Sequence, residues 1–303
     1  MSDDICLSLE EIQQLKSIEP LDHQHCSLSS YIIQGPIGKG QFSTVYRACS
    51  KVNGRNLALK KISLWSMVDS KSRQDCVKEA HLLPKLNHPH IIEYIAAFIE
   101  GSELNIALEL ADAGDLSLLI KGFAKLGFLI PEKTTWRILL QISSAINHMH
   151  SKKIMHRDIK PANVFLTLKG DVKLGDLGIA RYFSPETSIA HSFLGTPYYM
   201  SPERIQGHGY DFKSDIWSIG CLIYEMTALQ PPFHSREKNL MLICQRIATV
   251  DYPPIPSDLY SDELRSLTQV CLDKEMKKRP DSEQLHAIAQ EMWHKFNKAP
   301  SYS

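Results

Sequence analysis

The feature that most constrains this chain is the short segment HRDIKPAN at residues 156–163. It sets a carboxylate (Asp158), an ammonium group (Lys160) and an amide (Asn163) within one loop, a set that chance rarely assembles. A second carboxylate, Asp176, follows a predicted hairpin and the strand-like VKLG. The tripeptide Asp-Leu-Gly at residues 176–178 carries no information by itself. Asp176 becomes informative because it follows Asp158 after the predicted hairpin.

Hydrophobic periodicity divides the chain into two parts. Over residues 31–110, short runs such as NLALKKI and LNIALEL predict strands, with one helical stretch near 71–86 that Pro84 should bend or end. The later part is helical: Pro131 stands at a first helical position, and SDIWSIGCLIYEM is apolar nearly all round, as in a buried central helix. The sequence predicts an α+β, bilobal fold, with a small β-rich lobe and a larger, mainly α-helical lobe that meet near residues 109–114.

This division also sets the expected boundaries. Residues 1–30 are predicted to be a flexible N-terminal extension, 31–110 the N-lobe, 111–290 the C-lobe and 291–303 a C-terminal tail. The sequence contains no internal repeat and no low-complexity tract.

Composition excludes several classes of function. The 34 Lys and Arg residues are balanced by 34 Asp and Glu, so no overall field recruits nucleic acid or an anionic membrane. We expect neither a secretory signal nor a membrane-spanning segment. The seven cysteines are scattered without a C-x-x-C pair, which indicates reduced thiols in a cytosolic or nuclear protein.

The residues of the 156–163 segment suit phosphoryl transfer. That reaction needs groups that orient the attacking hydroxyl, offset charge on the moving phosphoryl group and hold magnesium. Asp158 suits the first task, as the base that takes the hydroxyl proton, and Lys160 suits the second. Asn163 and Asp176 suit the third, as ligands of Mg²⁺.

A glycine-rich turn and a lysine on a strand extend this interpretation. Gly38 and Gly40 lie between two strand patterns, where backbone N–H groups can approach phosphate oxygens, although any glycine-rich hairpin turn looks similar and the usual last glycine is Ser43 here. Lys60 could neutralise the α- and β-phosphates of a nucleotide, with Glu79 holding it in place. The alternative for Glu79 is a solvated helix residue.

In this order the motifs resemble those of the eukaryotic protein kinases over about residues 31–290. Leu177 in place of phenylalanine, with ELADAGDL, HRDIKPANVF and GTPYYMSPERI, is similar to the short NIMA-related serine/threonine kinases, in particular their sixth and seventh members. The resemblance implies an enzyme, a protein serine/threonine kinase that uses ATP and Mg²⁺. It makes Lys60 and Glu79 an ion pair, Asp158 the base and Lys160 a contact of the γ-phosphate.

The resemblance also implies a nucleotide site. Leu108 is expected at the back of the ATP pocket, with Glu109 and Ala111 offering backbone hydrogen bonds to adenine. Ordinary core packing is an equally good interpretation of the apolar members. The implied set is Ile37, Gly38, Lys39, Gly40, Gln41, Phe42, Ser43, Val45, Ala58, Lys60, Leu108, Glu109, Ala111, Asp115, Asn163, Phe165 and Asp176.

Two observations bear on the acceptor. Tyrosine kinases have a different pattern at the position of Lys160, so Lys160 indicates an aliphatic hydroxyl as the acceptor of the phosphoryl group. Thr196 is expected to bond Asp158 and Lys160 through its own hydroxyl. We hypothesise that the β-branched Ile179 makes threonine acceptable beside serine.

Two further pairs are expected to have scaffold roles. Asp215 should accept backbone N–H groups of the His156 loop, and Arg279 should pair with a buried Glu203. Neither role is catalytic.

Regulation is expected in the segment between Gly178 and Pro202. A phosphate on Ser192 would supply charge and acceptor oxygens to Arg157, although Ser192 can also be interpreted as simply exposed. Tyr94 matches a tyrosine that holds relatives inactive, and a buried aromatic of the small sheet is an equal alternative.

The main rival interpretation is a pseudokinase scaffold, but no catalytic residue is missing; a small-molecule phosphotransferase is disfavoured by GTPYYMSPE. Expected partners are protein substrates and a larger NIMA-related activating kinase or scaffold, with no nucleic acid and no membrane insertion, for a mostly monomeric protein. The resemblance suggests cell-cycle, microtubule, cytoskeletal or trafficking work at cytoplasmic, nuclear, spindle or other cytoskeletal sites.

Overall fold

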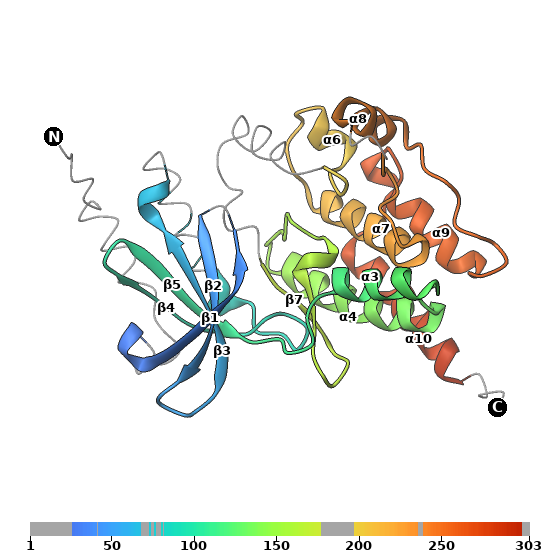
Figure 1. The fold of residues 1–303 in the computed structure, drawn as a ribbon. Helices are drawn as coiled ribbons and strands as arrows, with labels where there is room; N and C mark the ends of the chain where they lie inside the picture. Colours follow the sequence, from blue (N-terminus) through green and yellow to red (C-terminus); the bar gives the residue numbers. More distant parts are fainter. Residues whose placement is uncertain are drawn as a thin grey trace. The chain divides into compact units, whose positions relative to one another are not determined.

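The computed structural model describes residues 26–40, 42–67, 73, 76, 80, 82–176, 197–235 and 239–298. These residues form two compact units, of which the first ends at Ala111 and the second begins at Asp112 (Figure 1). The first unit is strand-rich and the second is mainly helical, so the predicted α+β fold is confirmed.

The first unit contains a five-stranded antiparallel sheet in the order β1-β2-β3-β5-β4. Gly54 and Gly101 have φ angles of 71° and 62° in the turns after β2 and β4, where a left-handed backbone favours glycine. The register of β1 against β2 shifts on both sides of Pro36, which has no N–H to donate to the ladder. The elements are η2 (Leu28–Ser30), β1 (Tyr31–Lys39), β2 (Ser43–Ser50), β3 (Asn56–Ser63), η3 (Leu64–Ser66), η4 (Leu83–Lys85), β4 (Tyr94–Glu100) and β5 (Glu103–Glu109).

One face of this sheet carries an apolar core. Side chains alternate along β3, so Leu57 and Leu59 lie on the face opposite to Ala58 and Lys60. Tyr31 and Phe98 stack with their ring centroids 6.0 Å apart. The core cluster consists of Tyr31, Ala48, Leu57, Leu59, Ala96, Phe98 and Ala107.

The segment just before β1 is anchored to this core. Cys26 and Leu28 pack against the cluster, and the Leu28 N–H donates to Glu100 Oε2 at 2.8 Å. Lys51 Nζ donates to the carbonyl oxygen of Ser29, also at 2.8 Å. These contacts correct the expectation of a flexible extension for residues 26–30; the rest of that extension lies outside the described residues.

The stretch predicted to be helical before β4 is described only in part. Arg73, Cys76 and Ala80 are helical, and Cys76 and Ala80 are buried. Pro84 lies in the 3-10 turn η4, which agrees with the expectation that it bends or ends the helix.

The second unit is built from helices with well-formed caps. Asp115 caps α3 by accepting from the Leu118 N–H, and a capping box joins Asp211 and Ser214 at the start of α7. Pro131 is the N-cap of α4, so the helix begins at Glu132, one position after the predicted first helical residue. The elements are α3 (Leu116–Leu126), α4 (Glu132–Ser151), η5 (Pro161–Asn163), β6 (Val164–Leu166), β7 (Val172–Leu174), α6 (Pro202–Ile205), α7 (Phe212–Ala228), α8 (Leu240–Thr249), α9 (Asp262–Cys271), η6 (Met276–Lys278) and α10 (Ser282–Lys298).

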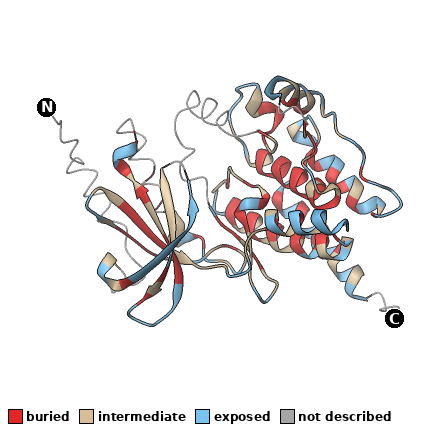
Figure 2. Ribbon diagram, in the orientation of Figure 1, coloured by how far each residue is buried: buried red, intermediate tan, exposed pale blue. Residues whose placement is uncertain are grey.

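Helix α7 is buried along nearly all of its length, as its continuous apolar run predicted (Figure 2). Helix α10 packs on α4 and continues to Lys298, which corrects the expectation that a tail begins at residue 291. Met292 is buried in this packing, so the chain beyond 290 still contributes to the core. None of the described helices is both long enough and apolar enough to span a membrane.

Candidate active site

The predicted catalytic loop lies between the end of α4 and the 3-10 turn η5, and one buried carboxylate holds it. Asp215 on α7 accepts the backbone N–H groups of His156 and Arg157, each at 2.9 Å and each on a different oxygen. Arg157 has a φ of 67°, which is unfavourable for a residue with a Cβ, so these two bonds hold a strained backbone in place. The predicted role of Asp215 is confirmed.

Asp215 also accepts two side-chain hydrogen bonds. His150 Nε2 donates at 2.8 Å and the Tyr210 hydroxyl donates at 2.5 Å. Burial by itself would raise the pKa of Asp215, but the hydrogen bonds from His150 and Tyr210 and the positive potential of His150 and His156 outweigh burial and lower that pKa. The carboxylate is therefore ionised at neutral pH and can accept all four hydrogen bonds.

His156 joins the loop to the residue before Asp176. Its Nε2 donates to the carbonyl oxygen of Gly175 at 3.1 Å, and its Nδ1 accepts the Asp158 N–H at 3.3 Å. Burial lowers the pKa of His156, despite nearby carboxylates that raise it. The ring is therefore neutral at pH 7, which matches one donating and one accepting nitrogen.

Three predicted residues converge within this loop. Lys160 Nζ donates to Asp158 Oδ2 at 2.9 Å. Asn163 Nδ2 donates to the same Oδ2 at 2.9 Å and to the Asp158 carbonyl oxygen at 2.8 Å. The Asp158 carboxylate is thus held at a fixed place beside an ammonium group, with 15% of its side chain exposed.

The amide and the second carboxylate fit a hard cation. Both hydrogen bonds of Asn163 Nδ2 go to Asp158, so Oδ1 is the amide atom that can ligate a metal. The Gly175 N–H donates to the Asn163 carbonyl oxygen at 3.0 Å, which ties the backbone before Asp176 to this loop. Asp176 is exposed and has a φ of 47°. Carboxylate and amide oxygens are the donor types that Mg²⁺ accepts.

Asp115 and Phe165, both in the predicted nucleotide set, are paired by a β-bridge in the second unit. The Leu166 N–H donates to the Gly114 carbonyl oxygen at 2.8 Å. Asp115 Oδ1 caps α3 at 2.9 Å from the Leu118 N–H, a structural role that the sequence analysis did not give it.

In the first unit, strand register brings four predicted residues to one sheet face. Val45 pairs with Lys60 across β2 and β3, and Ala58 pairs with Leu108 across β3 and β5. Directly paired residues share a face, and so do Ala58 and Lys60, two positions apart. This face is the one opposite to the apolar core cluster.

The two glycines of the glycine-rich turn differ in the space around them. The Gly40 N–H donates to the Ser43 carbonyl oxygen at 2.7 Å, and a Cβ on Gly40 would lie 2.9 Å from Ser43 Oγ. A Cβ on Gly38 would meet only Val45, at 3.7 Å, an ordinary contact. A residue larger than glycine at position 40 would therefore require the Ser43 side chain to move, whereas position 38 has room for a Cβ.

Two members of the predicted site are engaged or buried within the first unit. The Glu109 N–H donates to the Glu93 carbonyl oxygen at 2.9 Å and is not available to a ligand. Tyr94 is 4% exposed, and among the described residues its hydroxyl has no hydrogen-bond partner. Burial raises the pKa of Tyr94 to about 12. Its burial agrees with a sheet aromatic, and the autoinhibitory role stays a prediction.

A profile of the protein kinase domain matches residues 31–293. The chain belongs to the protein kinase family.

Curated relatives of this kinase are named Nek kinases, which confirms the predicted similarity to the NIMA-related group. It is 41% identical over 263 residues to "Probable serine/threonine-protein kinase nek2" of Dictyostelium discoideum, covering 85% of this chain and 62% of that protein. It is 43% identical over 248 residues to "Probable serine/threonine-protein kinase nek3" of the same organism, covering 80% and 22%. For human "Serine/threonine-protein kinase Nek2" the identity is 36% over 262 residues, covering 84% and 58%. The chain thus spans less than two thirds of each of these relatives.

Several predicted residues of the kinase lie outside the described residues: Gln41, Glu79, Ile179, Ser192 and Thr196. The pairing of Lys60 with Glu79 therefore stays a prediction.

The predicted buried pair of Arg279 and Glu203 is confirmed. Arg279 Nη1 and Nη2 each donate to Glu203 at 2.8 Å, and both side chains are buried. Burial would raise the pKa of Glu203, but the hydrogen bonds and charge of Arg279 outweigh it and lower that pKa. The Ser214 hydroxyl also donates to this carboxylate, at 2.7 Å.

Sequence reasoning missed three partners. His150 and Tyr210 both bond Asp215, and Tyr199 donates to Glu225 at 2.5 Å. His150 lies far from Asp215 in the sequence, and Tyr210 stands outside any motif, so spacing alone gave no signal. Tyr199 stands within GTPYYMSPE, where its own position was a signal.

Proposed function

We propose that the chain is an ATP-dependent protein serine/threonine kinase that transfers the γ-phosphoryl group of ATP with the help of Mg²⁺. The observation that carries this proposal is the convergence of Lys160 and Asn163 on one carboxylate oxygen of Asp158. Membership of the protein kinase family and the printed names of the relatives support it.

Asp158 orients the acceptor hydroxyl and takes its proton. Its carboxylate is fixed by Lys160 and Asn163, so it need not reorganise when the acceptor arrives. General-base help of this kind is worth about 10²- to 10⁴-fold. Lys160, 2.9 Å from Asp158, places a positive charge where the transferred group gains negative charge.

Asn163, through Oδ1, and Asp176, through its carboxylate, would hold Mg²⁺ when ATP is bound. The bound metal would neutralise charge on the phosphate oxygens. In the first unit, Lys60 contacts the α- and β-phosphates, and Val45, Ala58 and Leu108 form the apolar surface for adenine.

The acceptor class follows from Lys160 and from the relatives, whose names specify serine and threonine. We propose that Thr196 bonds Asp158 and Lys160 and that Ile179 admits threonine beside serine. A peptide array with strict serine preference would refute the role of Ile179.

Regulation is proposed to work through phosphorylation of Ser192, whose phosphate would pair with Arg157. Tyr94 is proposed as an autoinhibitory residue, and an unchanged basal activity in Tyr94→Ala would contradict it. We also propose that a larger NIMA-related kinase activates this protein. We propose that it is mostly monomeric, lies in the cytoplasm or nucleus, and acts at the spindle or cytoskeleton.

The test is transfer of labelled γ-phosphate to a generic protein substrate with Mg²⁺, followed by phospho-amino-acid analysis. Wild type should yield phosphoserine and phosphothreonine, and Asp158→Ala should yield neither. Ser192→Ala should lower activity. Absence of transfer by wild type, even after treatment with an activating kinase, would favour a scaffold without chemistry.

A further inference from the structure

The buried carboxylate of Asp215 divides its four hydrogen bonds evenly between its two oxygens. Oδ2 accepts from His150 Nε2 at 2.8 Å and from the His156 N–H at 2.9 Å. Oδ1 accepts from the Tyr210 hydroxyl at 2.5 Å and from the Arg157 N–H at 2.9 Å. Each oxygen therefore binds one side chain and one backbone group of the catalytic loop, and Tyr210 shares its oxygen with Arg157.

This sharing matters because of the residue that follows Arg157. Arg157 has a left-handed backbone, with a φ of 67°, and the next residue is Asp158. The torsion that turns an aspartate carboxylate has a broad minimum, so by itself it fixes the two oxygens poorly. With His150 on one oxygen and Tyr210 on the other, the Asp215 carboxylate cannot turn without breaking a side-chain hydrogen bond. Without the Tyr210 hydroxyl, only the strained backbone of Arg157 would hold Oδ1.

Tyr210 is itself held in place between α6 and α7. Gly207 and Gly209, with φ angles of 77° and 90°, provide the left-handed turns that lead the chain to it. The guanidinium carbon of Arg204, on α6, lies 4.9 Å from the centre of the Tyr210 ring, a cation–π contact. Burial and the negative charge of Asp215 raise the pKa of Tyr210 well above its ordinary value. The hydroxyl therefore keeps its proton at neutral pH and stays a donor.

Helix α6, which carries Arg204, is anchored to α7. Glu203, the neighbour of Arg204, is buried and accepts the hydroxyl of Ser214, on α7, at 2.7 Å. Breaking a buried polar contact of this kind is costly because it leaves a group without a partner in the interior. A continuous set of contacts thus runs from α6 through the ring and the hydroxyl of Tyr210 to the carboxylate of Asp215.

We propose that Tyr210, oriented by Arg204, is a positioning residue for phosphoryl transfer. Its hydroxyl fixes Asp215 Oδ1, this oxygen fixes the Arg157 N–H, and the Asp158 carboxylate is thereby kept in the direction in which it meets the acceptor hydroxyl. Tyr210 acts only through Asp215 and takes no part in the chemistry. The inference rests on the proposed role of Asp158 as the base.

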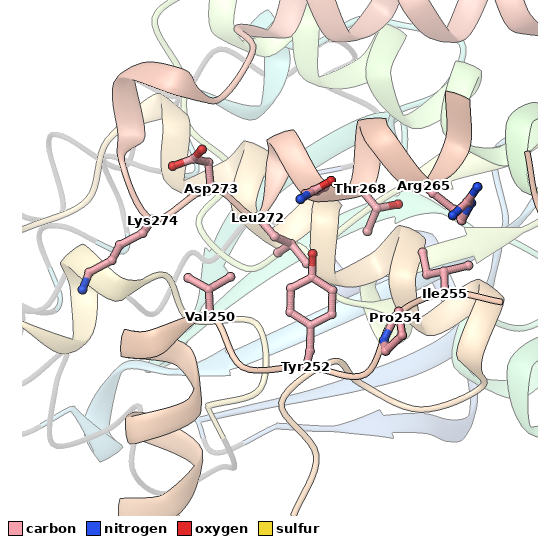
Figure 3. A pocket seen from close by; sticks show the side chains of 10 residues that line it. Val250, Tyr252, Pro254, Ile255, Arg265, Thr268, Leu272, Asp273 and Lys274 are labelled. Atoms are coloured by element: carbon pink, nitrogen blue, oxygen red, sulfur yellow. The ribbon is translucent and has the colours of Figure 1, made fainter. Parts of the chain in front are cut away.

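Two other tyrosines of the second unit serve as matched controls. The Tyr260 hydroxyl donates to the Ile130 carbonyl oxygen at 2.9 Å, outside the 156–163 segment. Tyr252 lines a cavity of about 490 Å³ between α9 and the segment that follows α8, which begins at Val250, with a left-handed φ of 57° (Figure 3). The lining of this cavity includes none of the residues predicted for phosphoryl transfer. Replacing any of the three tyrosines by Phe removes one hydroxyl and nothing else.

The first experiment measures steady-state transfer of γ-phosphate and urea unfolding for the full-length wild type and the three variants. Tyr210→Phe should lower kcat about 10-fold and leave the KM for ATP within about 2-fold, because a misplaced base costs rate rather than nucleotide binding. Tyr260→Phe and Tyr252→Phe should leave kcat within about 2-fold of wild type. The urea midpoint should fall by a similar amount in Tyr210→Phe and Tyr260→Phe, since each loses a buried hydrogen bond.

A double-mutant cycle tests whether Tyr210 acts through Asp215. In an Asp215→Asn background, Tyr210→Phe should lower kcat less than about 2-fold, because the charged acceptor that it holds is already lost. Arg204 is tested by two replacements, of which Lys keeps a cation near the ring and Met does not. Arg204→Met should lose about 3-fold in kcat, and Arg204→Lys should lose less.

Hydrogen exchange of the loop amides gives a readout that does not depend on catalysis. It is measured by mass spectrometry on a proteolytic peptide that contains His156 and Arg157. Exchange in this peptide should be about 10-fold faster in Tyr210→Phe than in wild type and unchanged in Tyr260→Phe.

Three results would overturn the proposal. They are a kcat for Tyr210→Phe within about 2-fold of wild type, equal losses of kcat in Tyr210→Phe and Tyr260→Phe, and an unchanged amide exchange of the loop in Tyr210→Phe. An inactive wild type would instead contradict the proposed kinase activity, and the amide exchange would still decide whether Tyr210 holds the loop.

Discussion

The predicted nucleotide and catalytic residues are positioned in different ways in the two units. In the second unit Asp158 and Lys160 lie on a loop with left-handed backbone at Arg157, held by the four hydrogen bonds of Asp215. In the first unit Val45, Ala58 and Lys60 share a face because the strands are in register. The polar backbone groups of an irregular loop each need a buried hydrogen-bond partner. In the sheet, side chains reach the site face because they alternate along the strands, and the packed core on the other face holds the strands in place. Loss of one partner should therefore be drastic in the loop and graded in the sheet.

The largest expected effect comes from Asp215→Ala. It leaves two backbone N–H groups and His150 without an acceptor in the interior, so the free energy of unfolding should fall by about 3–5 kcal/mol. Phosphoryl transfer should drop at least about 100-fold because the loop loses its geometry. Urea denaturation and a transfer assay measure the two effects. Asp215→Asn keeps one acceptor oxygen and should lie between; an unchanged rate in both variants would contradict the role given to this carboxylate.

The matching change in the sheet is Leu59→Ala on β3. Leu59 is fully buried in the core cluster, so truncation should lower the free energy of unfolding by about 2–5 kcal/mol. Lys61→Ala on the same strand is the control: its ion pair with Glu103, at 2.6 Å, is partly exposed and should contribute less than about 1 kcal/mol. Equal losses in the two variants would show that the apolar face does not hold the sheet.

Close helix packing in the second unit is tested by Gly220→Ala on α7. A Cβ there would lie 2.9 Å from Cys271 Cβ and 3.0 Å from Leu272, so the variant should lose about 1–3 kcal/mol of unfolding free energy. Gly122→Ala on α3 has nothing within 4 Å of the added Cβ and should gain up to about 1 kcal/mol from helix propensity. Thermal unfolding of both variants compares them; a stabilising Gly220→Ala would mean that α7 and α9 can move apart at little cost.

The smallest effect is a pH dependence from Glu225. Burial raises the pKa of Glu225 to about 6, although the hydrogen bond from Tyr199 and the charge of Lys121 oppose this. Because the native state holds its proton more tightly than the unfolded state does, stability should fall as pH rises from about 4.5 to 6, by at most about 2 kcal/mol.

Urea denaturation between pH 4 and 7, compared with Glu225→Gln, isolates this contribution from that of the histidines. The variant should lack the fall. Tyr199→Phe removes a hydrogen bond to the charged form, so the fall should move to higher pH. Identical pH profiles for wild type and Glu225→Gln would refute the assignment.

The sequence predicted those parts of the molecule that depend on motifs and on periodicity. Asp215 and the Glu203–Arg279 pair could be named because each belongs to a recognisable segment and has one obvious partner. The bond of His150 to Asp215 could not, since it joins residues of α4 and α7 through tertiary packing. The bond of Tyr210 could not because Tyr210, although near Asp215 in the sequence, belongs to no recognisable motif. The anchoring of Cys26 and Leu28 was also missed, because it rests on one hydrogen bond to Glu100 and on contacts with a distant sheet face.

The cavity lined by Val250 and Tyr252 was likewise beyond sequence reasoning. A left-handed valine has no sequence signature, and the hydroxyl of a tyrosine in an apolar cluster gives no hint of the direction in which it points. Helix α10 extended past the predicted boundary for a related reason: Met292 is one buried residue among polar neighbours, a weak signal in a single sequence.

The most direct test of the central claim separates nucleotide binding from chemistry. Single-turnover transfer of γ-phosphate and the dissociation constant of Mg²⁺-ATP are measured for wild type, Asp158→Asn and the control Asp258→Asn, an exposed residue outside the loop. The proposed role of Asp158 predicts that Asp158→Asn binds ATP within about 3-fold of wild type and loses at least about 100-fold in transfer, while Asp258→Asn changes neither. A transfer rate for Asp158→Asn equal to that of wild type would contradict the assignment of Asp158 as the base that the loop is built to hold.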